Sequence, residues 1–405
     1  MAPPSVFQRI LDYSHRADPY PLYAELRKTP VRREEDGTYV VSGYEEIVSL
    51  LHDPRVSVGR PQPGEPRDAE KEPPSFLRLD PPEHDRLRRV AMRHFGPPHS
   101  PHRVDGLRPE LFGIVRELID GVAGRTRIDI VDDVAYPFPV TVICRILGVP
   151  REDEARFHDW ADAVIESLDP REEGRPERLR RRENAVVELH RYLGGIAAER
   201  RRNPGDDLIS GLVTDEGPDG AMSPTEVAAN GALLLIAGHE TTVNLITNGM
   251  LTLLRHPELL DRLRHEPNLA IGLVEELLRY EPPVHLRSTR IALEDIMIGD
   301  ITIPEGAPIV LALAAGSRDP KRVPDPDRFD PDRRPNQHLG FGGGIHYCFG
   351  APLARLEAQI ALTELARRLR NPRLVTDPPP YRPSPELRGP RHLLLDIDGV
   401  IQPAR

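Results

Sequence analysis

The residues best suited to chemistry form a glycine-rich run that contains a single cysteine. The run is Phe341-Gly342-Gly343-Gly344-Ile345-His346-Tyr347-Cys348-Phe349-Gly350, and Ala351-Pro352-Leu353-Ala354-Arg355 follows it. Glycine lets a backbone adopt positive φ and approach a flat ligand closely. A helix that begins just after Cys348 offers free N–H groups and positive potential, which favour a thiolate. The pattern indicates a soft anionic ligand for a metal with a large planar surround, rather than a structural cysteine in a turn.

A second candidate lies within an apolar helical run, where Ala237-Gly238-His239-Glu240-Thr241-Thr242 brings an acid and two hydroxyls together. The small residues Ala237 and Gly238 leave room for a ligand against the helix backbone. Threonine hydroxyls can bond to preceding carbonyls and open the helix. Taken alone, the six residues would also suit a polar patch on a surface helix.

These residues require long helices to position them. Ser223-Pro224-Thr225-Glu226 predicts a helix start with an N-cap, a proline at N1 and an acid at N3, and the helix continues to about Arg255. Further helices are expected over 82–95, 257–265 and 269–280 and from Gly350 onward, with short strands at 296–298 and 301–303. The sequence predicts a mainly α fold with a minor β region near 30–60 and 284–310, in a single domain spanning 1–405.

Composition narrows the class of protein. Hydrophobic residues make up 39% of the 405 and charged residues 29%, which is typical of a soluble globular protein, and the net charge of −10 argues against general nucleic-acid binding. Two cysteines cannot form a disulfide framework, and Cys144 lies in an apolar run that predicts a core thiol. With no signal peptide and no membrane-length apolar segment, the expected location is the cytoplasm.

The cysteine run resembles the haem-binding loop of the cytochrome P-450 superfamily, soluble bacterial type, whose pattern F-G-x-G-x-H-x-C-x-G it matches at every fixed position. The resemblance implies that the Cys348 thiolate is the axial ligand of haem iron. It also implies that haem b lies between the cysteine loop and the long helix. Glu240 and Thr241 correspond to the family's acid–alcohol pair, which relays protons to bound dioxygen.

Other motifs occur in the family's order. Glu276 and Arg279 lie three apart on one helix face and can pair. Pro324-Asp325-Pro326-Asp327-Arg328-Phe329 resembles the family's meander, which predicts a buried network of Glu276, Arg279 and Arg328. Its role would be structural, and losing one partner would cost roughly 3–5 kcal/mol.

Haem propionates need cationic or donor partners. His84 and Arg88, four apart on one helix face, match the family's H-x-x-x-R pair, and Arg290 and His346 match two more propionate contacts. The full predicted cofactor set is His84, Arg88, Ala237, Gly238, Arg290, Phe341, Gly342, His346, Cys348 and Gly350.

The substrate walls follow by analogy with the family. They include the loop 57–77 and the segment 284–289. If that segment is an extended strand, Leu286, Ser288 and Arg290 share one face, so Leu286 would overhang the haem and Arg287 would face away. The predicted pocket residues are Leu233, Leu234, Ala237, Val284 and Leu286, and they suggest a mostly apolar substrate.

The resemblance implies a monomeric monooxygenase that uses O2 and hydroxylates or epoxidises this substrate. The chain has no room for a reductase domain, so electrons would come from a ferredoxin with its NAD(P)H-dependent reductase. The docking surface would be formed either by Arg88, Arg89 and Arg93 or by Arg355 and nearby basic residues. A haem sensor or carrier, or a family member doing oxidative coupling or peroxide-driven oxidation, are the alternatives. The Glu240–Thr241 pair disfavours both.

The C-terminal run Leu393-Leu394-Leu395-Asp396-Ile397-Asp398-Gly399-Val400 resembles the first motif of aspartate-nucleophile phosphatases. Few residues follow Asp398, and that chemistry needs further metal and phosphate ligands. We therefore interpret the run as a terminal strand.

Overall fold

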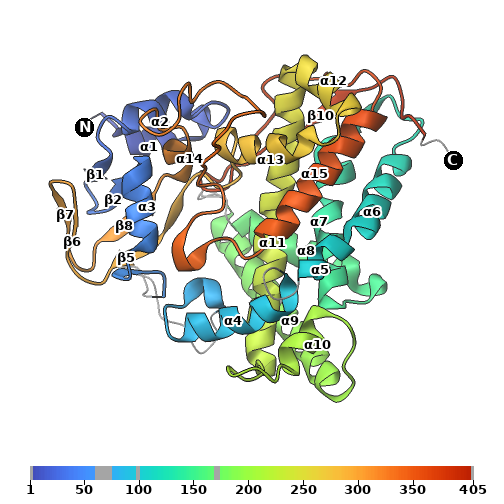
Figure 1. Cartoon of the computed structure of the whole chain (residues 1–405), viewed down its shortest axis with the longest axis horizontal. Coiled ribbons are helices and arrows are strands. Elements are labelled where there is room, and N and C mark those ends of the chain that lie inside the picture. Colours follow the sequence, from blue (N-terminus) through green and yellow to red (C-terminus); the bar gives the residue numbers. More distant parts are fainter. Residues whose placement is uncertain (1–2, 60–74, 97–100, 168–173, 403–405) are drawn as a thin grey trace.

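The computed structural model describes residues 3–59, 75–96, 101–167 and 174–402. Most of this chain is helical, and a small sheet lies to one side of the helical body (Figure 1). The helices are α1 Val6–Leu11, α2 Tyr20–Leu26, α3 Tyr44–His52, α4 Glu83–Phe95, α5 Pro101–Gly106, α6 Arg108–Gly121, α7 Pro137–Leu147, α8 Glu154–Ser167, α9 Arg175–Arg202, α10 Leu208–Val213, α11 Pro224–Arg255, α12 Pro257–His265, α13 Leu269–Tyr280, α14 Leu313–Ser317 and α15 Ala351–Arg368. Shorter turns of helix are η1 Tyr13–His15, η2 Phe76–Arg78, η3 Val131–Ala135, η4 Arg151–Asp153 and η5 Gly344–His346.

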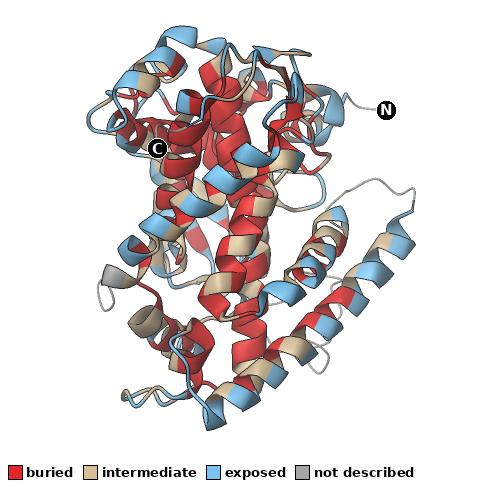
Figure 2. Ribbon diagram, turned by 90° about the vertical axis from the view of Figure 1, so that its right-hand side faces the viewer, coloured by how far each residue is buried: buried red, intermediate tan, exposed pale blue. Residues whose placement is uncertain are grey.

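Helix α11 runs through the centre of the molecule, and Figure 2 shows buried residues concentrated along the central helices. It begins as the sequence predicts. The Ser223 hydroxyl accepts a hydrogen bond from the Glu226 N–H, and the Glu226 carboxylate accepts one from the Ser223 N–H at 2.8 Å. This reciprocal cap satisfies N–H groups that the first turn leaves free. Because α11 is packed on most sides, several polar residues in its middle are buried against other elements, among them His239, Glu240 and Asn244.

The larger sheet has the strand order β1-β2-β8-β5-β3, and β2 and β8 are its only parallel pair. A second sheet joins β4, β10 and β9, and β6 and β7 form a hairpin at the predicted positions. The strands are β1 Val31–Arg33, β2 Tyr39–Val41, β3 Val56–Ser57, β4 Arg127–Asp129, β5 Arg287–Ala292, β6 Ile296–Ile298, β7 Ile301–Ile303, β8 Pro308–Leu311, β9 Arg373–Leu374 and β10 Leu394–Asp396. The expected terminal strand is therefore β10. Asp398 beyond it binds Asn371 and Arg373.

Strand β5 contains an irregularity that matters for the site. Arg287 is opposite Leu311 of β8, and Arg290 is opposite Ile309, so three residues on β5 correspond to two on β8. Such a bulge breaks the alternation of side chains along a strand.

The buried network on α13 differs from the sequence prediction. Glu276 and Arg279 form two hydrogen bonds at 2.7 and 2.8 Å, and both side chains are fully buried. The third side chain is Arg333, whose Nε lies 3.3 Å from Glu276 Oε1. The prediction of Arg328 was wrong, because its side chain is 71% exposed and only its carbonyl accepts from Arg279.

None of the described helices combines the length and the apolar character needed to cross a bilayer.

Candidate active site

Cys348 lies in the loop between η5 and α15. Its N–H donates to the Phe341 carbonyl at 2.9 Å, which closes the glycine-rich run into a tight loop. Gly342 and Gly344 have φ of +67° and +63°, in the left-handed region that other residues adopt at a cost. A Cβ at position 344 would also collide with the Leu51 carbonyl, so glycine is needed there for space as well.

Once a metal cation replaces the proton of the Cys348 thiol, the groups around the sulfur stabilise it as a thiolate. Burial raises the pKa of the Cys348 thiol. The N–H groups of Gly350 and Ala351, and the charges of Arg88 and Arg355, act in the opposite direction. A coordinating metal deprotonates a thiol outright, and these donors then stabilise the thiolate.

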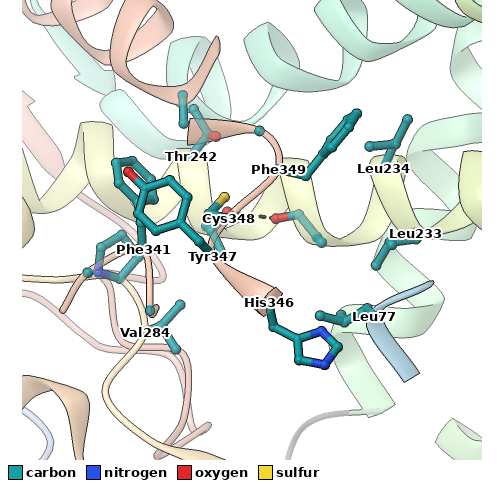
Figure 3. Close-up of a pocket in the computed structure, with 18 of the residues that line it drawn as sticks. Leu77, Leu233, Leu234, Thr242, Val284, Phe341, His346, Tyr347, Cys348 and Phe349 are labelled. Atoms are coloured by element: carbon teal, nitrogen blue, oxygen red, sulfur yellow. Dashed lines mark hydrogen bonds between the residues drawn. The ribbon is translucent and has the colours of Figure 1, made fainter. Parts of the chain in front are cut away.

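The sulfur faces a large cavity between the cysteine loop and α11. The cavity holds about 1430 Å³ of empty space, its open mouth included. Figure 3 shows Cys348 at the centre of the lining side chains. The apolar part of the wall consists of Leu51, Val58, Phe76, Leu77, Phe95, Ile143, Leu233, Leu234, Ala237, Leu245, Leu278, Val284, Leu313, Phe341, Phe349 and Leu353.

Four of the predicted pocket residues line this cavity, namely Leu233, Leu234, Ala237 and Val284. Val58, Phe76 and Leu77 from the predicted loop line it too, whereas 60–74 lie outside the described residues. Phe95 had no signal in the sequence, because a single apolar residue in a helix is an ordinary core residue.

The prediction for Leu286 was wrong. Leu286 is 2% exposed and packs in a separate core with Leu22 and Tyr23, whereas Arg287 and Arg290 both line the cavity. The bulge in β5 is the reason, because it lets residues three apart point to the same side.

The four predicted propionate contacts come together at one end of the cavity. Arg88, Arg290 and His346 line it, and the His84 ring lies 4.5 Å from the His346 ring. Three of their polar atoms are buried with no partner among the described residues: His84 Nε2, His346 Nδ1 and Arg290 Nη1. Leaving each unpaired costs about 1–3 kcal/mol, so their convergence marks a place for an anionic group. Two carboxylates of a planar cofactor fit this donor set.

Glu240 and Thr241, the acid and the alcohol on α11, lie in different environments. Thr241 lines the cavity, and its hydroxyl donates to the Ala237 carbonyl at 2.7 Å. Glu240 is not among the described lining residues. Its Oε1 lies 3.0 Å from Arg382 Nε and accepts from Asn244 Nδ2 at 3.2 Å. Burial raises the pKa of Glu240, and the charge of Arg382 opposes this. Arg382 belongs to the C-terminal loops and carried no local sequence signal.

Comparison with known proteins agrees with this geometry. The family model described as cytochrome P-450 matches residues 3–388. The chain is 40% identical to the cytochrome P-450 monooxygenase PikC of Streptomyces venezuelae, over 96% of this chain and 93% of that protein. It is 37% identical to the 6-deoxyerythronolide B hydroxylase of Saccharopolyspora erythraea, over 95% and 98%. A crystal structure of a myxobacterial cytochrome P-450, CYP267B1 with myristic acid, superposes with a TM-score of 0.86 at 38% identity, over 98% and 100%.

The chain belongs to the cytochrome P-450 family. Members of the family bind haem b through a cysteine thiolate, and its bacterial members act as monooxygenases or hydroxylases that use O2 and redox partners.

Proposed function

We propose that this chain inserts one oxygen atom from O2 into a mostly apolar organic substrate, with Cys348 as the thiolate ligand of haem iron. The observation that carries the proposal is the position of the Cys348 sulfur. It faces a cavity that is lined by Thr241 on one side and by unpaired buried donors at one end.

Each part of the site has a task under this proposal. His84, Arg88, Arg290 and His346 would hold the two propionates, and Ala237 and Gly238 leave space beside α11. When bound, haem supplies the oxygen activation, and the protein sets the axial ligand, the access and the orientation of the substrate.

Proton supply would use Glu240 and Thr241. The Thr241 hydroxyl is in the cavity, and Glu240 lies one residue earlier on α11, against Arg382. A proton from Glu240 would reach Thr241 Oγ1 through water. For this, Glu240 has to loosen its ion pair with Arg382, since that pair stabilises the anion and opposes protonation.

The walls support an apolar substrate, because leucine, valine and phenylalanine side chains make up most of the surface away from the propionate end. The relatives act on or bind molecules of this kind: one is named for 6-deoxyerythronolide B, and another was crystallised with myristic acid.

Electrons would come from an acidic ferredoxin that docks on the face carrying the cysteine loop. Ile345 and Tyr347 are 47% and 40% exposed there, which provides an apolar centre for an interface. Of the predicted basic residues, Arg89 and Arg93 pair with Asp219 and Asp215, and Arg355 pairs with Glu275. Because these pairs neutralise much of the positive charge, we expect only a moderate fall in reduction rate with salt.

The experiment measures product formed per NAD(P)H with ferredoxin and reductase, using a compound that shifts the Soret band of the ferric protein. Thr241→Ala should keep haem and the spectral shift but release most electrons as peroxide. The control is Thr247→Ala, since the Thr247 hydroxyl makes the same kind of helix bond, to Val243 at 2.9 Å, outside the cavity. Unchanged coupling in Thr241→Ala would contradict the proton role. A wild-type protein that forms no product would contradict the proposed function.

A further inference from the structure

The cavity contains a charged residue that haem binding does not explain. Arg287, at the start of β5, lines the cavity together with Arg290 because of the bulge between them. Two propionates already have four donors in His84, Arg88, Arg290 and His346. Arg287 is therefore an additional guanidinium in a mostly apolar wall.

Arg287 has no ion pair within 4 Å to any described residue. The acid whose charge acts most on Arg287 is Glu386, which accepts a hydrogen bond from the neighbouring Ser288 hydroxyl. Burial lowers the pKa of Arg287, and the charge of Arg78 acts in the same direction. Burial also lowers the pKa of Arg290, to about 9, with a further contribution from the charge of Arg287.

The carboxylates of the cavity do not offset these charges. Among the described lining residues the only carboxyl is that of Glu357 on α15, and burial holds its pKa well above the usual range. The wall therefore presents a surplus of positive charge, and an anion that enters with an apolar body would reduce it.

We propose that Arg287 binds the carboxylate of an otherwise apolar substrate, such as a long-chain acid. This inference rests on the proposed function and narrows its substrate class. A guanidinium matches a carboxylate through two parallel hydrogen bonds, and the surrounding leucine and phenylalanine side chains suit a hydrocarbon body. The competing explanation is that Arg287 is a fifth propionate contact.

The test uses haem-loaded protein and two matched probes, dodecanoic acid and its methyl ester. Dissociation constants come from the shift of the ferric Soret band, and a second readout is the rise in melting temperature with each probe. Wild-type protein should bind the acid about 10- to 100-fold more tightly than the ester, as expected for a charge-assisted hydrogen-bond pair.

Two variants test the residue. Arg287→Met should lower affinity for the acid to that for the ester and leave ester binding unchanged, whereas Arg287→Lys should keep part of the preference. Equal binding of acid and ester by the wild type would overturn the inference, and so would a preference that survives in Arg287→Met.

The haem content of the variants distinguishes a substrate contact at Arg287 from a propionate contact. If Arg287→Met loses haem as readily as His84→Ala and the preference for the acid persists, Arg287 is a propionate contact and the inference is overturned. A wild type that prefers the acid but forms no product with O2 and electrons would overturn the proposed function and leave this inference standing.

Discussion

Arg382 Nε and Glu240 Oε1 lie 3.0 Å apart, and both side chains are almost fully buried, at 9% and 3% exposed. The pair joins the acid of α11 to a loop near the C-terminus. Its Coulomb energy is offset by the cost of removing two charges from water, so the pair contributes little to stability as a whole. Breaking it is different, because one charge then stays buried without its partner.

Arg382→Met should therefore destabilise the protein in a pH-dependent way. Burial raises the pKa of Glu240, so the folded state binds that proton more tightly than the unfolded chain. Stability from this group is complete below the unfolded pKa, about 4.3, and is lost as pH rises through the folded pKa. Without Arg382 that pKa rises further. We expect a loss of about 3–5 kcal/mol at pH 8 and a smaller loss at pH 5.

Urea unfolding of the haem-loaded protein at the two pH values measures this effect. The double variant Arg382→Met/Glu240→Gln removes the buried charge and should lose the pH dependence. An equal loss at both pH values in the single variant would show that Glu240 carries no charge in the folded protein.

The network on α13 predicts unequal effects for two arginines. Arg333→Met removes a side chain that is 11% exposed and bonded to buried Glu276, so the free energy of unfolding should fall by about 3 kcal/mol or more. Arg328→Met is the control, since the Arg328 side chain is 71% exposed and should contribute under about 1 kcal/mol. Similar losses in both variants would instead show that the Arg328 side chain also stabilises the network.

The cysteine loop offers a matched pair of glycines. Gly344→Ala places a Cβ against the Leu51 carbonyl at φ +63°, so the loop must move and haem content after purification should fall sharply. Gly342→Ala meets nothing within 4 Å and should cost only the left-handed conformation, about 1–2 kcal/mol. Normal haem content in Gly344→Ala would mean that the loop tolerates the shift.

The unpaired donors predict the rate of haem loss. Under the proposed function, Arg290→Leu or His84→Ala removes a partner of a haem propionate, so transfer of haem to apomyoglobin should be about tenfold faster or more. His265→Ala serves as the control, because its side chain is 75% exposed on α12. Unchanged transfer in both variants would exclude these residues as propionate contacts.

The sequence predicted those parts of the site that depend on neighbouring residues. The loop around Cys348, the cap at Ser223 and the hairpin β6–β7 are local patterns, and the structure has them where they were expected. The mainly α fold followed from the same kind of evidence.

What the sequence did not predict depends on contacts between distant segments. Arg333 replaces Arg328 because the meander folds back so that the Arg328 carbonyl, rather than its side chain, faces Arg279. Leu286 and Arg287 exchange roles because strand alternation fails at a bulge. Arg382 meets Glu240 from a separate loop, and nothing near either residue indicates the other.

The cavity wall at the bulge in β5 can tolerate a change of chain length that the cysteine loop cannot. A change of one residue in length between Arg287 and Arg290 would alter the backbone beside the cavity, while Arg287 stays opposite Leu311 and Arg290 opposite Ile309, so both side chains keep their face. The cysteine loop has no such freedom, since Gly344 and the Phe341 carbonyl fix its path. In this chain, the cavity wall can therefore vary in length at one point while Arg290 and the loop that presents Cys348 keep their positions.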